Sequence, residues 1–345
     1  MAYTDLTTTK DFQALKVKTD FRANQFQTIQ MFKDLTSDYV GLTPELINFL
    51  QTKMQRDFTI PVIPDETFAV TTHESFVIPA NYGTTGTMTA TTYTHWSGFR
   101  HLEASYNENQ VASDTAKIDK LMKVARAIAT AMTTQLLSIV DANKSQVFDK
   151  NFASNDGFSF AASAMSLTKG AQEESLFMSI LDKLMKDNNV NGDNVMLSHP
   201  GIFLAQFIKD MYGANNDKNI QEQFPKIYPE TTITNADRWT AYLIEKGSFG
   251  IVPNIPFDYR NRKLSGDGWQ FGTTAGTVPF VNDNLFTLHR NSATDASGHS
   301  TNTSAYHTTT EDEYGFGYKY TVLAPYNRDI TSFINPVVKV KGLTA

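Results

Sequence analysis

Residues 114–143 read DTAKIDKLMKVARAIATAMTTQLLSIVDAN and are the most informative segment of this sequence. Apolar residues recur there at steps of three and four, as they do on one face of an α-helix. Asp114 is of a type that caps helix N-termini. At about 1.5 Å per residue, the segment predicts a single rod of about 45 Å. Its predicted packing face is Ile118, Leu121, Met122, Ala125, Ile128, Ala129, Met132, Leu136, Ile139 and Val140.

Length and composition narrow the class of protein. A chain of 345 residues can bury a sizeable core and suggests about two domains. The absence of cysteine excludes disulfides and thiolate metal sites. A formal net charge of −6 argues against a broad basic face for nucleic acid. No apolar run approaches the about 20 residues of a membrane span, and the N-terminus lacks the pattern of a secretory signal.

The N-terminal region, residues 1–60, combines a polar arm with short helical segments. Phe12, Phe21, Phe26 and Phe32 punctuate it, and a helix is expected near residues 25–35. Two interpretations fit: an arm that packs against another surface, or a frayed terminus with one short helix. A second helix should begin at Pro44, because proline is favoured at the first helical position. Pro61 and Pro64 should then start an extended region.

Residues 61–96 predict an extended β-hairpin loop. Between Thr84 and Thr94, small and polar side chains occupy both strand faces, so the strand lacks a buried face of its own. One interpretation is a projecting hairpin that pairs with a neighbouring subunit. The alternative is an exposed two-stranded ribbon without a role.

Beyond the long helix the pattern is mixed α/β. Strands are predicted near residues 152–162, 195–197, 240–244, 250–252, 318–324 and 333–341, with helices over 176–185 and 203–211. Residues 291–313 are rich in Ser, Thr, His and Asn, and we predict a long loop there because nothing in the stretch can build a core.

Catalytic and metal-binding patterns are absent from the sequence. His199 is the most enzyme-like position, because it follows a short buried strand, but it fits a helix N-terminus better than an active site. His299 and His307 share the polar stretch with two aspartates and lack the spacing of a zinc site. The calcium-loop half-match that opens at Asp187 lacks its final glutamate, since Ser198 stands there. We predict no enzyme activity, no catalytic or metal residues, and no cofactor.

The order of these segments resembles the major capsid protein of tailed bacteriophages, which has the Hong Kong 97-like fold. The resemblance rests on a Thr-rich hairpin, then NENQ at 107–110 leading through Asp114 into the long helix. The segment VMLSHPGIF at 195–203 is similar to a strand-to-helix step in the family's axial domain. The ending, YKYT at 318–321 and NPVVKV at 335–340, is similar to the closing peripheral-domain strands.

This resemblance implies an α+β fold with four parts: an arm and short helix (1–60), an extended loop (61–96), a peripheral domain (97–162 and 314–345) and an axial domain (163–313). The spine helix would be 114–143. It implies a virion protein, assembled in the host bacterial cytoplasm, whose pentamers and hexamers enclose double-stranded DNA. Scaffolding, portal and decoration proteins would be further partners, and no membrane is implied.

Candidate assembly contacts follow from the arm, the hairpin and the basic residues near the spine. They are Phe12, Phe21, Phe26, Thr84, Thr85, Thr87, Met88, Thr89, Arg100 and Lys117. Lys120, Lys123 and Arg126 could also face acidic neighbours or packaged DNA. Two rival functions remain: another virion protein such as a tail or decoration subunit, and an α/β enzyme with a site near His199.

Overall fold

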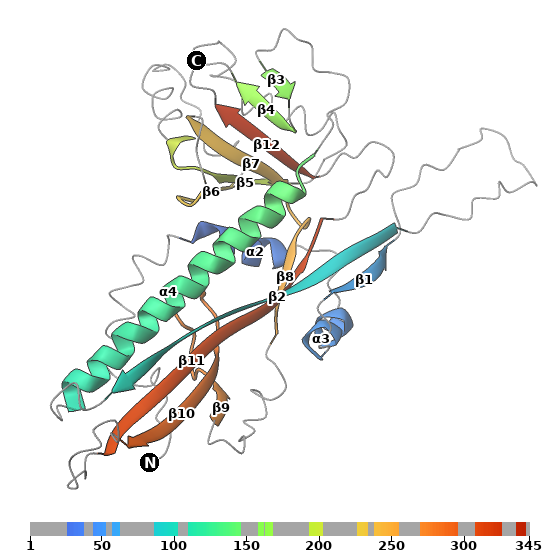
Figure 1. The fold of residues 1–345 in the computed structure, drawn as a ribbon. Helices are drawn as coiled ribbons and strands as arrows, with labels where there is room; N and C mark the ends of the chain where they lie inside the picture. The colour runs from blue at the N-terminus through green and yellow to red at the C-terminus, as the bar shows by residue number, and fades with distance from the viewer. Residues whose placement is uncertain are drawn as a thin grey trace, which may run out of the picture.

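The chain is of mixed α+β class, and its described residues form helices and two six-stranded sheets (Figure 1). The structure is a computed structural model that describes residues 26–37, 44–52, 57–62, 86–102, 110–145, 158–161, 163–167, 193–202, 226–233, 238–254, 270–295, 308–325 and 336–342. The helices predicted over 176–185 and 203–211 lie outside these residues.

The long helix α4 spans Gln110–Ala142, 33 residues without a break. Nine of the ten residues predicted to pack are buried, and the tenth, Ile139, is half-buried. Its start is earlier than predicted, so Asp114 lies inside the helix and is not its cap. Ser113, one residue before it, is buried and lies 2.7 Å from His101, between Oγ and Nε2. The first turn of α4, residues 110–113, is therefore helical although its sequence shows no apolar periodicity, and the Ser113–His101 contact ties this turn to β2.

The first sheet lies along α4 and is antiparallel throughout. Its order is β1 (Asp57–Val62), β2 (Gly86–Leu102), β11 (Thr308–Leu323), β10 (Phe286–Asp295) and β9 (Gln270–Thr273). Strand β8 (Gly250–Asn254) also pairs with β11. Figure 1 shows β2 and β11 as two long, twisted strands that run beside the helix.

The prediction of a loop over residues 291–313 is wrong at both ends of that stretch. Strands β10 and β11 continue into it, and their pairing runs from Asn291 opposite Asp312 to Asp295 opposite Thr308. The ladder is built from backbone groups, so it needs no apolar side chains. Apolar neighbours such as Phe286 and Phe316 fix the register, and the polar residues follow in it.

The Thr-rich hairpin is partly integrated in the first sheet. Strand β1 begins at Asp57, so Pro61 lies within a strand instead of preceding one, opposite Thr87. Pro61 is tolerated there because, among the described strands, β1 is the last in the sheet order. From Ala90 onward, β2 pairs with β11 of the same chain. Only residues 86–89 of β2 have β1 as their sole described strand partner, which corrects the prediction that the whole Thr-rich segment projects.

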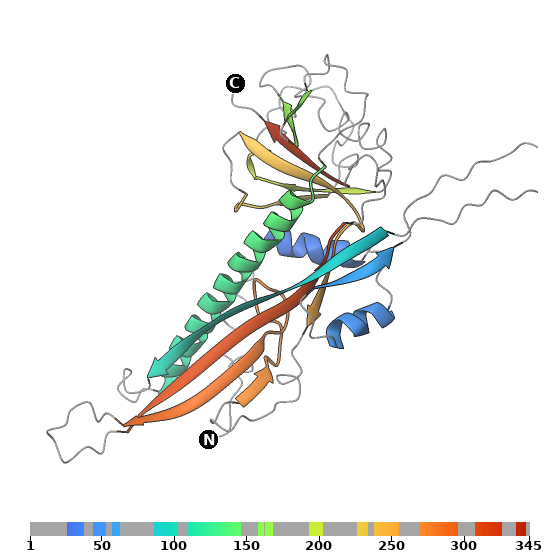
Figure 2. The same ribbon diagram turned by 45° about the vertical axis from the view of Figure 1, so that its right-hand side comes forward.

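The second sheet contains the short buried strands that the sequence predicted. Its order is β3 (Phe158–Ala161), β4 (Ala164–Leu167), β12 (Val337–Gly342), β7 (Trp239–Glu245), β5 (Asn194–Ser198) and β6 (Lys226–Pro229). The β4–β12 and β5–β6 pairs are parallel, and the others are antiparallel. Figure 2 shows this sheet at the C-terminal end of α4.

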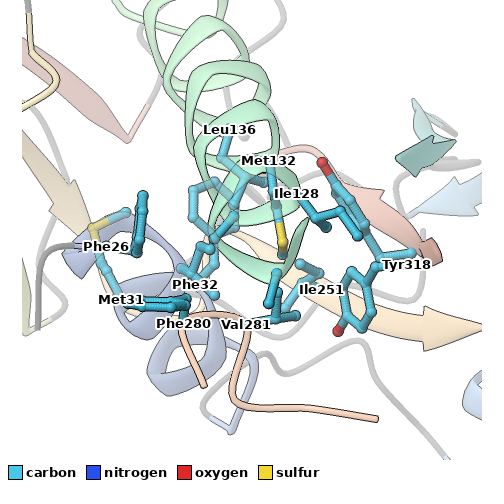
Figure 3. Packing of buried hydrophobic residues seen from close by; sticks show 14 of the residues in the cluster. Phe26, Met31, Phe32, Ile128, Met132, Leu136, Ile251, Phe280, Val281 and Tyr318 are labelled. Atoms are coloured by element: carbon cyan, nitrogen blue, oxygen red, sulfur yellow. The ribbon is translucent and has the colours of Figure 1, made fainter. Parts of the chain in front are cut away.

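Two shorter helices complete the described fold. Helix α2 (Gln27–Ser37) packs against α4 and β8, and helix α3 (Pro44–Thr52) begins at the proline, as predicted. Phe26, Met31 and Phe32 enter the core beside Met132 and Leu136 of α4 (Figure 3). The core therefore lies between α2, α4 and both sheets.

Strand pairing crosses the domain ranges expected from the sequence. Strands β8, β9 and β10 fall in the range 163–313 but pair with or beside β11 in the first sheet. Conversely, β12 falls in the range 314–345 but lies between β4 and β7 in the second sheet. Residues distant in sequence share a sheet because ladder partners are set by packing, and chain order alone does not reveal them.

Candidate assembly surfaces

A buried polar cluster joins α4 to the first sheet. Lys117 Nζ donates to Asp312 Oδ2 at 3.0 Å, and His289 Nε2 lies 3.4 Å from Asp312 Oδ1. The side chains of Lys117 and Asp312 are each 7 % exposed. His101 is the direct cross-strand neighbour of Asp312 and reaches Ser113 on α4. The cluster therefore fixes the position of α4 along β2, β10 and β11.

The charge state of Asp312 follows from this setting. Burial acts to raise the pKa of its carboxyl, but hydrogen bonds from His289 and Lys117, together with the positive charge of Lys117, outweigh it and lower the pKa to about 2. Asp312 is thus an ionised partner for the buried ammonium of Lys117 at neutral pH. Each charge compensates the other in this buried site, because either one alone would be costly to bury.

Two predicted assembly contacts belong to the chain's own core. Lys117 is enclosed with Asp312, and Phe26 is buried with its ring edge against Phe280, at a centroid distance of 5.7 Å. Neither side chain presents a surface to a neighbouring subunit, so both assignments are corrected. The sequence could not reveal this, because Asp312 and Phe280 are remote from their partners in the chain.

The structure describes some of the remaining predicted contact residues and leaves others outside its described ranges. Arg100 is on the solvent face of β2, with its side chain 71 % exposed and its guanidinium 2.9 Å from Glu313. Thr87 is exposed on the ribbon of β1 and β2. Met88 and Thr89 lie in the same strand, and nothing is described of their side chains. Phe12, Phe21, Thr84 and Thr85 lie outside the described residues.

An aromatic platform on the outer face of the first sheet was not predicted. Trp96 stacks on Phe286 with a centroid distance of 5.6 Å, and 47 % of Trp96 is exposed. Its ring covers Gly315 and Gly317 of β11 so closely that a Cβ at either glycine would collide with it. The alternation Gly315-Phe316-Gly317 is the sequence signal, since it leaves one strand face bare.

The solvent face of α4 changes character along its length. The N-terminal half carries charge: Lys120 donates to the Arg100 carbonyl, and Lys123 pairs with Asp119. The C-terminal half exposes only small side chains, namely Ala127, Thr130, Ala131, Thr134, Ser138 and Ala142. Two of the basic residues expected to face partners are therefore engaged on the chain's own surface.

The His199 region is a helix start. The Gly201 amide donates to His199 Nδ1 at 3.0 Å, which is a capping contact, and the His199 amide donates to the Thr240 carbonyl. Among the described residues, no three His, Asp or Glu side chains gather as a metal site would require. Within the same ranges, no helix has the length and apolarity to cross a membrane.

Solved structures from phages align with most of this chain. One, titled Mycobacterium phage Bobi, aligns over 91 % of both chains with 10 % identity and a TM-score of 0.48. The cyanophage A-1(L) capsid asymmetric unit covers 89 % of this chain and 96 % of its own, at 12 % identity and a TM-score of 0.45. The capsid of Myoviridae phage XM1 covers 85 % and 88 %, at 9 % identity and a TM-score of 0.38.

The chain resembles phage capsid chains. Two of these structures are titled as phage capsids, and the third carries only the name of a phage. No family model and no curated protein matches the chain. At identities near one tenth, no residue role can be transferred, and function must be inferred from the chain's own geometry.

Proposed function

We propose that the chain is the major capsid protein of a tailed phage, with the Hong Kong 97-like fold, and that its copies close an icosahedral shell around double-stranded DNA. Pentamers and hexamers would form from identical chains in the bacterial cytoplasm. In this proposal α4 is the spine helix, the first sheet belongs to the peripheral domain, and the second sheet belongs to the axial domain. The protein is not an enzyme and needs no cofactor.

The observation that carries the proposal is a rigid frame with an extension. Helix α4 is fastened along β2 and β11 by an apolar face and by the buried Lys117–Asp312 pair. At one end of this frame the ribbon of β1 and β2 continues past Ala90, the last residue of β2 that pairs with β11. A frame of fixed shape sets the angle at which neighbours meet, and an extension reaches them, which is what a closed assembly requires.

Strand edges and multiple weak contacts explain how such a ribbon would act. Strand β1 ends the described sheet order, so its outer backbone groups can accept a further strand by β-addition. Individually weak contacts are sufficient, because simultaneous engagement of several neighbours raises the effective affinity. Scaffolding, portal and decoration proteins are proposed as further partners, and DNA contact would be non-specific.

The test is to shorten the ribbon without disturbing the frame. Thr59 and Thr89 are cross-strand partners, so residues 60–88 can be replaced by Asn-Gly, a two-residue turn suited to an antiparallel hairpin. We expect a folded, helical chain that forms no closed particles by electron microscopy, whereas the unmodified chain forms shells. Closed particles of normal size from the shortened chain would contradict the role of the ribbon.

A matched control uses the other long hairpin. Asp295 and Thr308 are also partners, so the same Asn-Gly replacement can be made for residues 296–307. Loss of particles in both variants would mean that the effect is not specific to the β1–β2 ribbon. Rings or monomers from the unmodified chain would instead favour a tail or decoration subunit. A bound small molecule that is lost in His199→Ala would favour an enzyme.

A further inference from the structure

The face of the first sheet that points away from α4 carries a group of residues that we call the indole site. Phe99 lies under Lys120 of α4, and side chains alternate along a strand, so the residues on either side of Phe99 point away from the helix. Strands β2 and β11 lie side by side there (Figure 1). The site consists of three adjacent cross-strand pairs, Trp96–Gly317, Gly98–Gly315 and Arg100–Glu313.

The indole of Trp96 lies flat on the sheet. A Cβ at Gly315 would collide with Cζ2 of the ring, and a Cβ at Gly317 would collide with Cε3, on the opposite side of the same six-membered ring. One face of the indole therefore covers both glycines, and the ring meets Phe286 with 24° between the two ring planes. Because 47 % of Trp96 is nevertheless exposed, the other face of the indole is open to solvent.

A bare stretch of backbone lies between the indole and the charged pair. Gly98 is exposed and has no side chain, and a Cβ there would collide with the carbonyl oxygen of Tyr314. Trp96 and Arg100 are four residues apart on the same strand face, so their Cα atoms are separated by about 14 Å at about 3.4 Å per residue. This spacing leaves room for a ring on the indole and for polar substituents beside Arg100.

Charged side chains border the indole on both sides. The guanidinium of Arg100 lies 2.9 Å from Glu313, with 71 % of the Arg100 side chain and 16 % of the Glu313 side chain exposed. Arg290 of β10 is the cross-strand neighbour of Glu313 on its other side. Lys319 lies in the next outward-facing pair beyond Trp96. These four side chains carry three positive charges and one negative charge, so the surroundings of the indole favour an anionic group.

An acidic pyranose sugar matches this combination of groups. The face of an aromatic ring has negative potential, so it attracts the weakly positive C–H bonds on the flat side of a sugar ring. Sugar hydroxyl groups both donate and accept hydrogen bonds, and a guanidinium beside a carboxylate supplies both functions. A carboxylate on the sugar would form charge-assisted hydrogen bonds with the surrounding cations.

We propose that the indole site binds a pyranose sugar that carries a carboxylate, of the kind found in uronate-containing polysaccharides. The sugar ring stacks on Trp96, and its hydroxyl and carboxylate groups bind at Arg100 and Glu313. The site belongs to the single chain. If copies form a shell as proposed above with this face outward, many weak sites act together on one polysaccharide, and that consequence rests on the proposed function.

The test is saturation-transfer NMR of the full chain with three small probes: methyl β-glucuronide, methyl β-glucoside and acetate. The method detects ligand protons that contact the protein, and it works for single chains and for particles alike. We expect the ring C–H protons of the glucuronide to receive the largest transfer. The glucuronide should bind more tightly than the glucoside, and acetate should bind far more weakly than the glucuronide.

Substitutions of the indole separate stacking from simple apolar cover. Trp96→Ala should weaken glucuronide binding by about tenfold or more. Trp96→Leu keeps an apolar side chain over the glycines but has no aromatic face, so it should lose binding to a similar extent, and it decides the question if Trp96→Ala fails to fold. Phe49→Ala removes another exposed aromatic side chain, 42 % exposed on α3, and should leave the affinity unchanged.

A substitution of the charged pair tests the preference for an acidic sugar. Arg100→Met removes the guanidinium and leaves the carboxylate of Glu313 in place, so the glucuronide should lose its advantage over the glucoside. Lys123→Met removes an exposed cation from α4 and should preserve that advantage.

The proposal is overturned if the glucuronide receives no transfer, if the glucoside or acetate binds as tightly, or if Trp96→Leu binds like wild type. If the sugars fail to bind and Trp96→Leu instead prevents particle formation, the indole site is a contact between copies, which also overturns it. Sugar binding by a chain that forms no particles would contradict the proposed function alone. Shells that bind no sugar would contradict this inference alone.

Discussion

Lys117 and Asp312 are separated by 195 positions in the sequence, yet their Nζ and Oδ2 atoms lie 3.0 Å apart. Both side chains are almost fully enclosed, and His289 contacts the other carboxylate oxygen. This pair links the N-terminal half of α4 to the strand that lies in the middle of the first sheet. The position of the helix therefore depends on a contact that cannot be predicted from the sequence of either segment.

Lys117→Met should destabilise the chain strongly, because it leaves the buried carboxylate of Asp312 without its ammonium partner. Removal of one member of a buried pair typically costs about 3–5 kcal/mol. The measurement is the free energy of unfolding in urea. Lys123→Met breaks an exposed pair on the same helix and should cost only about 0.3–0.5 kcal/mol. Equal losses in both variants would show that burial does not govern the Lys117 contact.

Acid should selectively weaken the wild-type chain through Asp312. Its pKa lies near 2 in the folded chain, below the ordinary value of 3.8, so ionisation stabilises the fold. That contribution is present above about pH 4 and is lost as the pH falls toward 2. The free energy of unfolding of wild type should exceed that of Asp312→Asn at neutral pH, and the difference should shrink below pH 4. A difference that is constant down to pH 2 would contradict the assignment.

Gly315→Ala should destabilise the first sheet, because the new methyl group would collide with the indole of Trp96. Overpacking of this kind costs about 1–3 kcal/mol. In a Trp96→Ala background the same substitution should cost much less, since the three atoms nearest to the new methyl group all belong to Trp96. Gly317 also meets Phe286, so Trp96→Ala should relieve Gly317→Ala less completely. Thermal unfolding of the six chains, wild type included, tests this pattern, and additive effects at Gly315 would exclude it.

Ala129→Asp should prevent folding, because Ala129 is fully buried on the packing face of α4 and an unpaired charge there is very costly. Ala127→Asp introduces the same residue two positions earlier, on the solvent face, and should be tolerated. Circular dichroism and solubility distinguish the two. A soluble, folded Ala129→Asp chain would mean that the assigned packing face is wrong.

Several elements were predictable because their signal is local. The packing face of α4 follows from apolar spacing, the start of α3 from Pro44, and the buried strands β5 and β7 from short apolar runs. The strands at 291–295 and 308–313 were not predictable, because a backbone ladder leaves no trace in polar side chains. Lys117 and Phe26 were predicted as surface contacts but are buried, because the exposure of a side chain depends on partners elsewhere in the chain.

The sequence alone determined that a long amphipathic rod exists, which residues form its packing face, and that short strands accompany it. Helical periodicity and apolar runs are properties of neighbouring residues, so they can be recognised from the sequence without a structure. Tertiary structure alone decided that β12 pairs with β7, that Asp312 meets Lys117, and that Trp96 covers two glycines. These contacts join segments far apart in the chain, and only the packing of the whole molecule selects them.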